Sequence, residues 1–181
     1  MNHSNIKVLC SISTRGRTDS SLPMVLQSVI NQTYKPHKIV IFDDNDEQID
    51  LRTKPIYNEL FPIIEDAGMH WEVQFGGKIG QHHNHQIANT MGYDWVWRLD
   101  DDTFADPTVL ETLCSYIDED VGAVAGSVLT PSIYRTLNPG SPSGLISDIR
   151  TSANLQWFPI TSVVEVEHLH CSFLYLSLIH I

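Results

Sequence analysis

Short apolar segments alternate with amphipathic ones along the first two thirds of the chain, and this alternation constrains the fold more than any other feature. Apolar runs of strand length cover residues 7–13, 39–42, 71–75 and 95–99, and part of 121–129. Segments with apolar residues at helical spacing separate them, at 22–31, 56–67, 81–91 and 107–117. Such alternation is typical of a mainly parallel sheet with helices on both faces, so we predict a Rossmann-like α/β fold.

Proline and glycine predict where two of these helices begin, end or bend. Pro23 suits the first turn of the helix at 22–31. Gly68 is expected to end the helix at 56–67, and Pro62 to kink or divide it. Residues 130–160 are rich in proline and glycine and predict a long loop, followed by strands at 163–166 and 172–176.

Length and composition describe one globular domain with a substantial core. The chain has 181 residues, and its formal net charge of −11 argues against nucleic acid as a partner. Its three cysteines, Cys10, Cys114 and Cys171, lie in apolar runs and indicate reduced thiols in a cytoplasmic protein. No apolar run reaches the roughly 18 residues of a membrane span, so no transmembrane segment is expected.

Three carboxylates, Asp100, Asp101 and Asp102, directly follow the apolar strand at 95–99. Adjacent carboxylates repel one another, and a bound cation removes the repulsion. Mg2+ and Mn2+ prefer such oxygen ligands. The triplet therefore indicates a metal site, with a solvated acidic turn as the alternative.

Polar residues also follow two other predicted strands. Thr14 and Arg15 come after the first strand, and Asp43 and Asp44 after the second. The carboxyl ends of parallel strands share one edge of a sheet, so these groups and the aspartate triplet are expected to meet in one crevice. This convergence favours a ligand site more strongly than any single motif does.

Three further groups keep more than one interpretation open. The segment Asp43–Asp46 can bind a base or ribose, or can simply form a turn. The glycines at 76–80 precede a helix and suit either phosphate or an ordinary turn. His82, His83 and His85 can contact substrate phosphates, bind metal, or be exposed or packed polar residues.

Trp95 and Trp97 point to one face of their strand and are expected in the core.

Taken together, these motifs resemble those of the family-2 glycosyltransferases, which have the GT-A fold. The resemblance covers roughly residues 6–130 and, more weakly, 160–175. It rests on Thr14-Arg15 after the first strand, the helix end from Ser28 to Tyr34, Asp43-Asp44, and the segment from Gly80 to Asn84 leading to the aspartate triplet.

The resemblance implies a nucleotide-diphosphate sugar donor, an acceptor that the sequence does not identify, and inverting transfer. The implied donor-binding residues are Thr14, Arg15, Asp44, Gly80, Gln81, Asn84, Asp100 and Asp101. The implied ligands of Mn2+ or Mg2+ are Asp102 and Asp100. His168 and His170 alternate in an expected strand and share a face, so His170 is a further candidate ligand, with a plain polar strand face as the alternative.

The C-terminal part departs from the family pattern, because the acidic acceptor-site motif that normally follows the late strand is absent. Residues 176–181 match a translated frame of a transposase sequencing adapter, so we expect a truncated GT-A domain at 1–175 and a non-native tail at 176–181. Such a chain is expected to bind donor without transferring sugar. The alternatives are a non-catalytic nucleotide-sugar-binding module and a haloacid-dehalogenase-like phosphatase.

Overall fold

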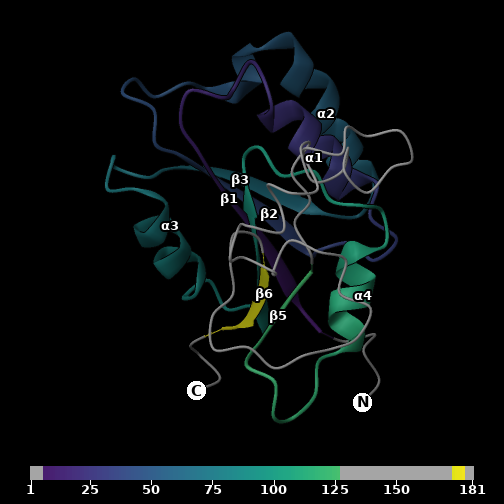
Figure 1. Ribbon diagram of the computed structural model, residues 1–181. Coiled ribbons are helices and arrows are strands. Elements are labelled where there is room, and N and C mark those ends of the chain that lie inside the picture. Colours follow the sequence, from purple (N-terminus) through teal and green to yellow (C-terminus); the bar gives the residue numbers. More distant parts are fainter. Residues whose placement is uncertain (1–5, 127–172, 178–181) are drawn as a thin grey trace, which may run out of the picture. The chain divides into compact units, whose positions relative to one another are not determined.

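The computed structural model describes residues 6–126 and 173–177, which contain a six-stranded sheet in the order β3-β2-β1-β4-β6-β5 (Figure 1). The strands are β1 (Val8–Thr14), β2 (Lys38–Asp43), β3 (His70–Phe75), β4 (Trp95–Asp100), β5 (Ala123–Ala125) and β6 (Phe173–Leu176). The first four run parallel, whereas β6 is antiparallel to both β4 and β5. The prediction of a mainly parallel sheet is confirmed.

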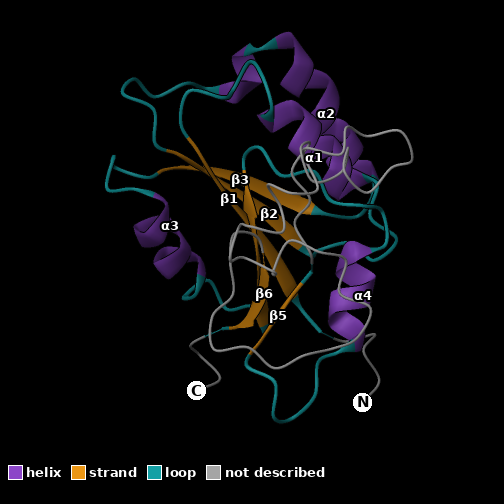
Figure 2. Cartoon of the chain, in the orientation of Figure 1, coloured by secondary structure: helices purple, strands orange, loops and turns teal. Residues whose placement is uncertain are grey.

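Helices cover both faces of this sheet, as predicted. They are α1 (Leu22–Ile30), α2 (Pro55–Asp66), α3 (Gln81–Ala88) and α4 (Val109–Ser115), with a short 3-10 helix η2 at Leu51–Thr53. Figure 2 shows α3 on one side of the sheet and the other three α-helices on the opposite side. Each predicted helix is found, although the third and fourth are shorter than the sequence indicated.

Two apolar clusters hold the helices to the sheet, because successive strand residues point to opposite faces. Val8, Cys10 and Ile12 of β1 join the larger cluster with α1, α2 and α4, and the intervening Leu9 joins the smaller cluster beneath α3. Trp95 and Trp97 are buried in the larger cluster, which confirms their assignment to the core.

Pro62 lies inside α2, which nevertheless forms one helix from Pro55 to Asp66 rather than two. Proline removes the hydrogen bond that its own nitrogen would donate to the carbonyl of Asn58. Both residues are on the exposed side of the helix, where water can satisfy that carbonyl. The buried side, with Tyr57, Phe61 and Ile64, packs without interruption.

Several predicted features lie outside the described residues. They include the loop at 130–160, the strand at 163–166, Cys171, His168 and His170. The strand expected at 172–176 is found as β6, and Ser177 after it is buried, its hydroxyl donating to the Asn89 carbonyl at 2.7 Å. The adapter origin of 176–181 stays a prediction, which the source DNA can test.

Candidate functional site

The carboxyl ends of β1, β2 and β4 bring together the polar residues that were expected to converge. In the parallel ladders, Thr14 lies opposite Asp43, and Ser13 lies opposite Asp100. Beyond the ladder, the Asp44 amide donates to the Thr14 carbonyl at 2.9 Å. Three segments that are distant in sequence therefore end side by side.

A charged group, here called the carboxylate cluster, joins the ends of β1 and β4 and consists of Thr14, Arg17, Asp101 and Asp102. The Thr14 hydroxyl donates to Asp101 Oδ2 at 2.8 Å, and the Arg15 amide reaches the same oxygen at 3.4 Å. The Arg17 guanidinium contacts Asp101 Oδ1 at 3.4 Å through Nε and Asp102 Oδ2 at 2.7 Å through Nη1. Burial raises the pKa of Asp101, and the Thr14 hydrogen bond and the Arg17 charge act against that shift.

Asp100 is oriented differently from its two neighbours in the triplet. Its Oδ1 lies 3.7 Å from Arg98 Nη2, and the Arg98 guanidinium stacks over the Phe173 ring at 5.7 Å. Within residues 6–126 and 173–177, no three His, Cys, Asp or Glu side chains gather into a group that could hold a metal ion.

A second group, here called the buried amide cluster, lies beneath α3 and consists of Ser13, Asp44, Gly76 and Asn84. Asn84 Nδ2 donates to Ser13 Oγ at 2.8 Å and to Asp44 Oδ2 at 3.1 Å. Asn84 is 0% exposed and Asp44 is 5% exposed. Asp44 Oδ1 has no hydrogen-bond donor among the described residues, and a buried acceptor of this kind calls for one.

Gly76 is required for the packing of this cluster. A Cβ built on Gly76 would overlap the Asp44 carboxylate and lie 2.6 Å from Asn84 Oδ1. Only glycine leaves room for both side chains to keep their positions.

In the segment Asp43–Asp46 the structure shows the turn, whereas binding of a base or ribose stays a prediction. Asp43 stabilises the turn, because its carboxylate accepts from the Asn45 amide at 2.9 Å and the Ile49 amide at 3.1 Å. Asp44 belongs instead to the buried amide cluster, and Asp46 pairs with Arg15 at 3.2 Å. The turn thus supports the residue that faces the candidate site.

Gly80 and Gln81 start α3, the helix that positions Asn84. Gly80 has φ of 105°, a conformation that glycine adopts without strain, and Gln81 is exposed. The histidines of this helix lie in different surroundings: His82 is exposed, whereas His85 is buried with Nδ1 2.9 Å from Ser11 Oγ. Burial, together with Arg98 and His82, lowers the His85 pKa to about 3, which favours the packed alternative for this residue.

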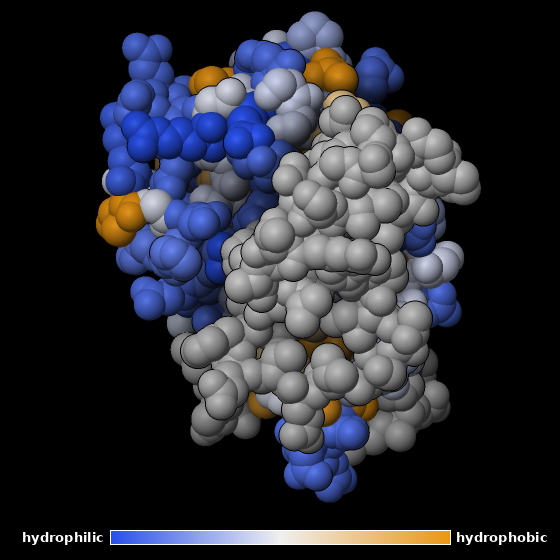
Figure 3. Space-filling view, viewed as in Figure 1, coloured by the Kyte–Doolittle hydropathy of each residue, from blue (hydrophilic) through white to orange (hydrophobic). Residues whose placement is uncertain are grey.

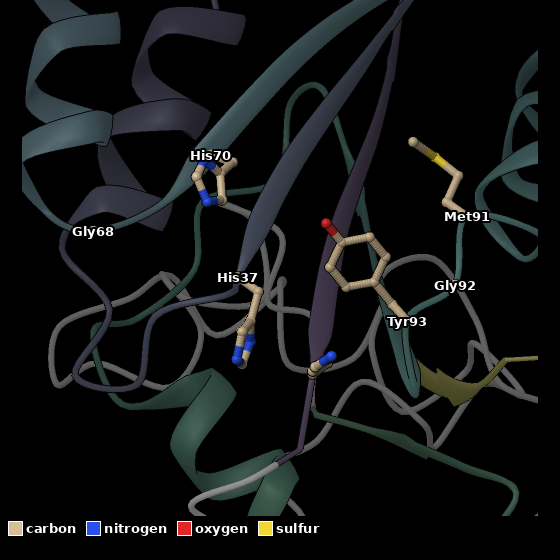
Figure 4. Close-up of a pocket in the computed structure, with 7 residues that line it drawn as sticks. His37, Gly68, His70, Met91, Gly92 and Tyr93 are labelled. Atoms are coloured by element: carbon tan, nitrogen blue, oxygen red, sulfur yellow. The ribbon is translucent and has the colours of Figure 1, made fainter.

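A cavity of about 420 Å³ lies at the opposite edge of the sheet (Figure 4). It is lined by Lys7, His37, Gly68, His70, Met91, Gly92 and Tyr93, which precede or begin the parallel strands. None of these residues was a predicted site residue. The cavity is separate from both clusters, which lie at the carboxyl ends of the same strands.

The surface around α3 is largely hydrophilic. On the face shown in Figure 3, blue side chains gather on the side where Figure 1 places α3 and the neighbouring loops. Isolated apolar side chains interrupt this region, and Ile79 in the loop before α3 is 67% exposed.

Sequence reasoning missed two residues of the two clusters, Ser13 and Arg17, and considered Gly76 only as one of the glycines at 76–80. A second basic residue two positions after Arg15 was the available signal for Arg17. Ser13 carries no local signal, and the packing role of Gly76 depends on Asn84 and Asp44, which come from other elements. His170, a predicted metal ligand, lies outside the described residues.

A mainly parallel sheet with helices on both faces and polar clusters at its carboxyl edge defines an α/β domain whose candidate site lies where open α/β sheets bind ligands. Comparison with known proteins gives the particular family. Residues 12–169 match the model of glycosyl transferase family 2. The chain therefore belongs to this family and contains a family-2 glycosyltransferase domain.

Relatives and solved structures agree with this assignment. The chain is 34% identical over 113 residues to galactofuranosyltransferase GlfT1 of Mycolicibacterium smegmatis, a match that covers 60% of this chain and 35% of the relative. The fold is similar to that of the mannosyltransferase PcManGT from Pyrobaculum calidifontis in complex with GDP-Man and Mn2+ (TM-score 0.56, 18% identity, 74% of this chain and 39% of that one). It is also similar to S. aureus TarS 1-349 in complex with UDP-GlcNAc (TM-score 0.51, 16% identity, 70% and 36%).

The chain thus spans about a third of the length of the curated relative that it matches. None of the helices in the described part of the chain is both long and apolar enough to cross a membrane.

Proposed function

We propose that this domain binds a nucleotide-diphosphate sugar with the help of a divalent cation and transfers the sugar, with inversion, to an acceptor hydroxyl. The observation that carries the proposal is the pairing of two clusters at one sheet edge. One cluster presents a buried acceptor, Asp44 Oδ1, and the other presents carboxylates at the end of β4.

The buried amide cluster fits the nucleoside part of the donor. Asp44 Oδ1 is a buried carboxylate oxygen without a donor in the described residues, and a base N–H or a ribose hydroxyl supplies one. Asn84 keeps Asp44 in place by donating to its other oxygen. In this proposal Gly80 and Gln81 place α3, while Thr14, Arg15 and Asp101 line the path from the nucleoside to the diphosphate.

The carboxylates at the end of β4 fit Mn2+ or Mg2+ in their donor chemistry. Mg2+ is commonly bound by one or two carboxylates together with substrate phosphates, so Asp102 and Asp100 need no complete protein cage. This agrees with the absence of a group of three ligands among the described residues. PcManGT, which has a similar fold, is in complex with GDP-Man and Mn2+, which supports a divalent cation here. We also propose His170 as an additional ligand of that cation.

When bound, the cation supplies Lewis-acid neutralisation of the charge on the leaving diphosphate. The residues of the chain orient the donor: Asp44 holds the nucleoside, Thr14 orients Asp101, and Asp102 faces the diphosphate. Inversion requires the acceptor oxygen to approach the sugar from the side opposite the diphosphate, where a carboxylate removes its proton. We assign that base to none of the described residues.

Calorimetry with UDP and GDP, each with and without Mn2+, tests the donor assignment. Asp102→Asn should abolish the increase in nucleotide affinity that Mn2+ causes, because the amide lacks the charge that binds the cation. Asp66→Asn, an exposed position on α2, is the matched control and should bind like the unchanged chain. An unchanged Mn2+ effect in Asp102→Asn contradicts the metal assignment.

Transfer of radiolabelled sugar from a panel of UDP-, GDP-, dTDP- and CDP-sugars distinguishes an enzyme from a non-catalytic binding module. Transfer by a longer version of this protein supports the enzyme, whereas donor binding without transfer by that version supports the module. The family match leaves no support for the phosphatase alternative.

We further propose that the protein works in the cytoplasm. Cys10 and Cys114 are both buried and free, as expected for a protein kept in a reducing compartment. Expression in a reducing and in an oxidising compartment, followed by thiol titration, tests this placement.

A further inference from the structure

Arg17 occupies the place where the proposed function requires a cation. Its guanidinium bridges two of the three consecutive carboxylates, with Nη1 2.7 Å from Asp102 Oδ2 and Nε 3.4 Å from Asp101 Oδ1. Arg17 and Asp102 are each about half exposed, at 45% and 48% of their side-chain surface, so solvent and ligands can reach the pair. No role for Arg17 followed from the sequence.

The two carboxylates that Arg17 bridges differ in how firmly they are held. Asp101 is only 13% exposed and also accepts from the Thr14 hydroxyl and the Arg15 amide. Asp102 has Arg17 as its sole hydrogen-bonding or ion-pairing partner within the described residues. Asp101 therefore keeps its orientation when Arg17 moves, whereas Asp102 becomes free for another cation.

A divalent cation and a guanidinium compete for Asp102. Two cations within about 4 Å of each other repel, even with the screening of water. The planar guanidinium, in turn, matches the oxygen pairs of a phosphate as well as those of a carboxylate. Departure of Arg17 is therefore least costly when a diphosphate is present to receive it.

We propose that Arg17 neutralises Asp102 in the ligand-free protein and moves from this carboxylate to the donor diphosphate when the divalent cation binds. This inference rests on the proposed function. It makes Arg17 a positioning residue with two opposite effects: it opposes cation binding in the absence of nucleotide, and it favours nucleotide binding once the cation is present. Cation and nucleotide should consequently bind with positive coupling.

Mn2+ binding measured by electron paramagnetic resonance of the free ion, with the 181-residue chain and no nucleotide, tests the first effect. Arg17→Gln should tighten nucleotide-free Mn2+ binding roughly tenfold, because an exposed ion pair and the repulsion between cations each contribute a few-fold. Arg52→Gln is the matched control. It removes the same charge, but the Arg52 guanidinium pairs with Asp50 at 2.8 Å and belongs to neither cluster, so nucleotide-free Mn2+ affinity should stay unchanged.

Calorimetry with UDP and GDP at saturating Mn2+ tests the second effect. Arg17→Gln should weaken nucleotide binding about tenfold, since the diphosphate loses a charge-assisted hydrogen-bond partner. Tighter Mn2+ binding together with weaker nucleotide binding supports the exchange of partners. If Arg17→Gln does not fold, as judged by circular dichroism, Arg17→Lys replaces it. Lysine keeps the charge but lacks the planar set of donors of the guanidinium, so Mn2+ binding should tighten and nucleotide binding should weaken by two- to threefold each.

Three results overturn the inference. If the unchanged chain binds nucleotide with Mn2+ but Arg17→Gln leaves nucleotide-free Mn2+ affinity unaltered, the proposed function stands and the exchange does not. If nucleotide binding depends on Arg17 and not on Mn2+, Arg17 replaces the cation permanently instead of yielding to it. If neither the unchanged chain nor the Arg17 variants bind Mn2+ with or without nucleotide, both the inference and the proposed function fail.

Discussion

The two clusters at the sheet edge are built on different physical principles. The buried amide cluster is almost inaccessible to solvent and is held by hydrogen bonds and by close packing against Gly76. The carboxylate cluster is partly exposed and is held by ion pairs to Arg17 and by the Thr14 hydrogen bond. Buried hydrogen-bonded groups resist rearrangement, whereas exposed ion pairs contribute little and exchange easily. The comparison teaches that one sheet edge can place a rigid group of polar residues beside a group that rearranges at little cost in free energy.

Gly76→Ala should have the largest effect on the buried amide cluster. The added Cβ overlaps the Asp44 side chain, and the resulting rearrangement should lower the free energy of unfolding by about 3 kcal/mol. Chemical denaturation measures this loss. Gly122→Ala is the control, because a Cβ there meets no atom within 4 Å, and its stability should change little.

Asp44→Ala should weaken nucleotide binding even in the absence of metal. Loss of one charge-assisted hydrogen bond is expected to reduce the binding free energy by about 2 kcal/mol. Calorimetry with UDP and GDP and no divalent cation measures it. Asp102→Asn is the contrasting variant, since its effect should appear only with Mn2+; equal metal-free losses in both variants would contradict the division of roles.

His85, which is buried in α3, should make the free energy of unfolding depend on pH. The folded-state pKa is lowered to about 3, so the unfolded chain binds a proton more readily at mildly acidic pH. The contribution of neutral His85 is therefore complete above about pH 6.5 and is lost as the pH falls toward 3, by at most about 1.4 kcal/mol per pH unit. Chemical denaturation measures the free energy of unfolding at pH 7 and at pH 5. The loss between the two pH values should be smaller for His85→Gln than for the unchanged chain. His70→Gln, at an exposed residue, should keep the full difference.

Thr14→Val should have the smallest effect, confined to the carboxylate cluster. The substitution keeps the shape of a buried side chain but removes the hydroxyl that donates to Asp101, at an expected loss of about 1 kcal/mol in the free energy of unfolding. Thr112→Val on the exposed side of α4 is the control. A loss as large as that of Gly76→Ala would mean that the carboxylate cluster is as rigid as the buried one.

The sequence predicted the sheet, its helices and the convergence of three strand ends, because those features follow from local periodicity and from the geometry of parallel strands. It named Thr14, Asp44, Asn84 and Asp101 before any contact between them was known. The contacts of Arg17 and Gly76 could not be predicted in this way, because both depend on residues that come from other elements of the fold. Arg17 pairs with Asp102, which is 85 positions away in the sequence. Gly76 packs against Asp44 and Asn84, which come from two other segments of the chain.

Pro62 and the histidines of α3 show structural features that short-range sequence patterns do not predict. Pro62 was expected to kink or divide α2. The helix is not divided, because water on its exposed side can satisfy the carbonyl that proline leaves unpaired. His82 and His85 are three residues apart and were candidates for a shared function, yet only His85 turns toward the sheet. Helical spacing places two side chains near one another without determining how far each is buried.

One peptide bond separates the two clusters. Ser13 and Thr14 are consecutive in β1; Ser13 contacts Asn84 on one face of the sheet, and Thr14 contacts Asp101 on the other side of the strand end. Successive Cα atoms are about 3.8 Å apart, a spacing that covalent geometry does not allow to vary. The end of β1 therefore fixes the spacing between the two residues that join the clusters. A change of backbone conformation at Ser13 or Thr14 would displace both clusters together, although they share no side-chain contact through these two residues.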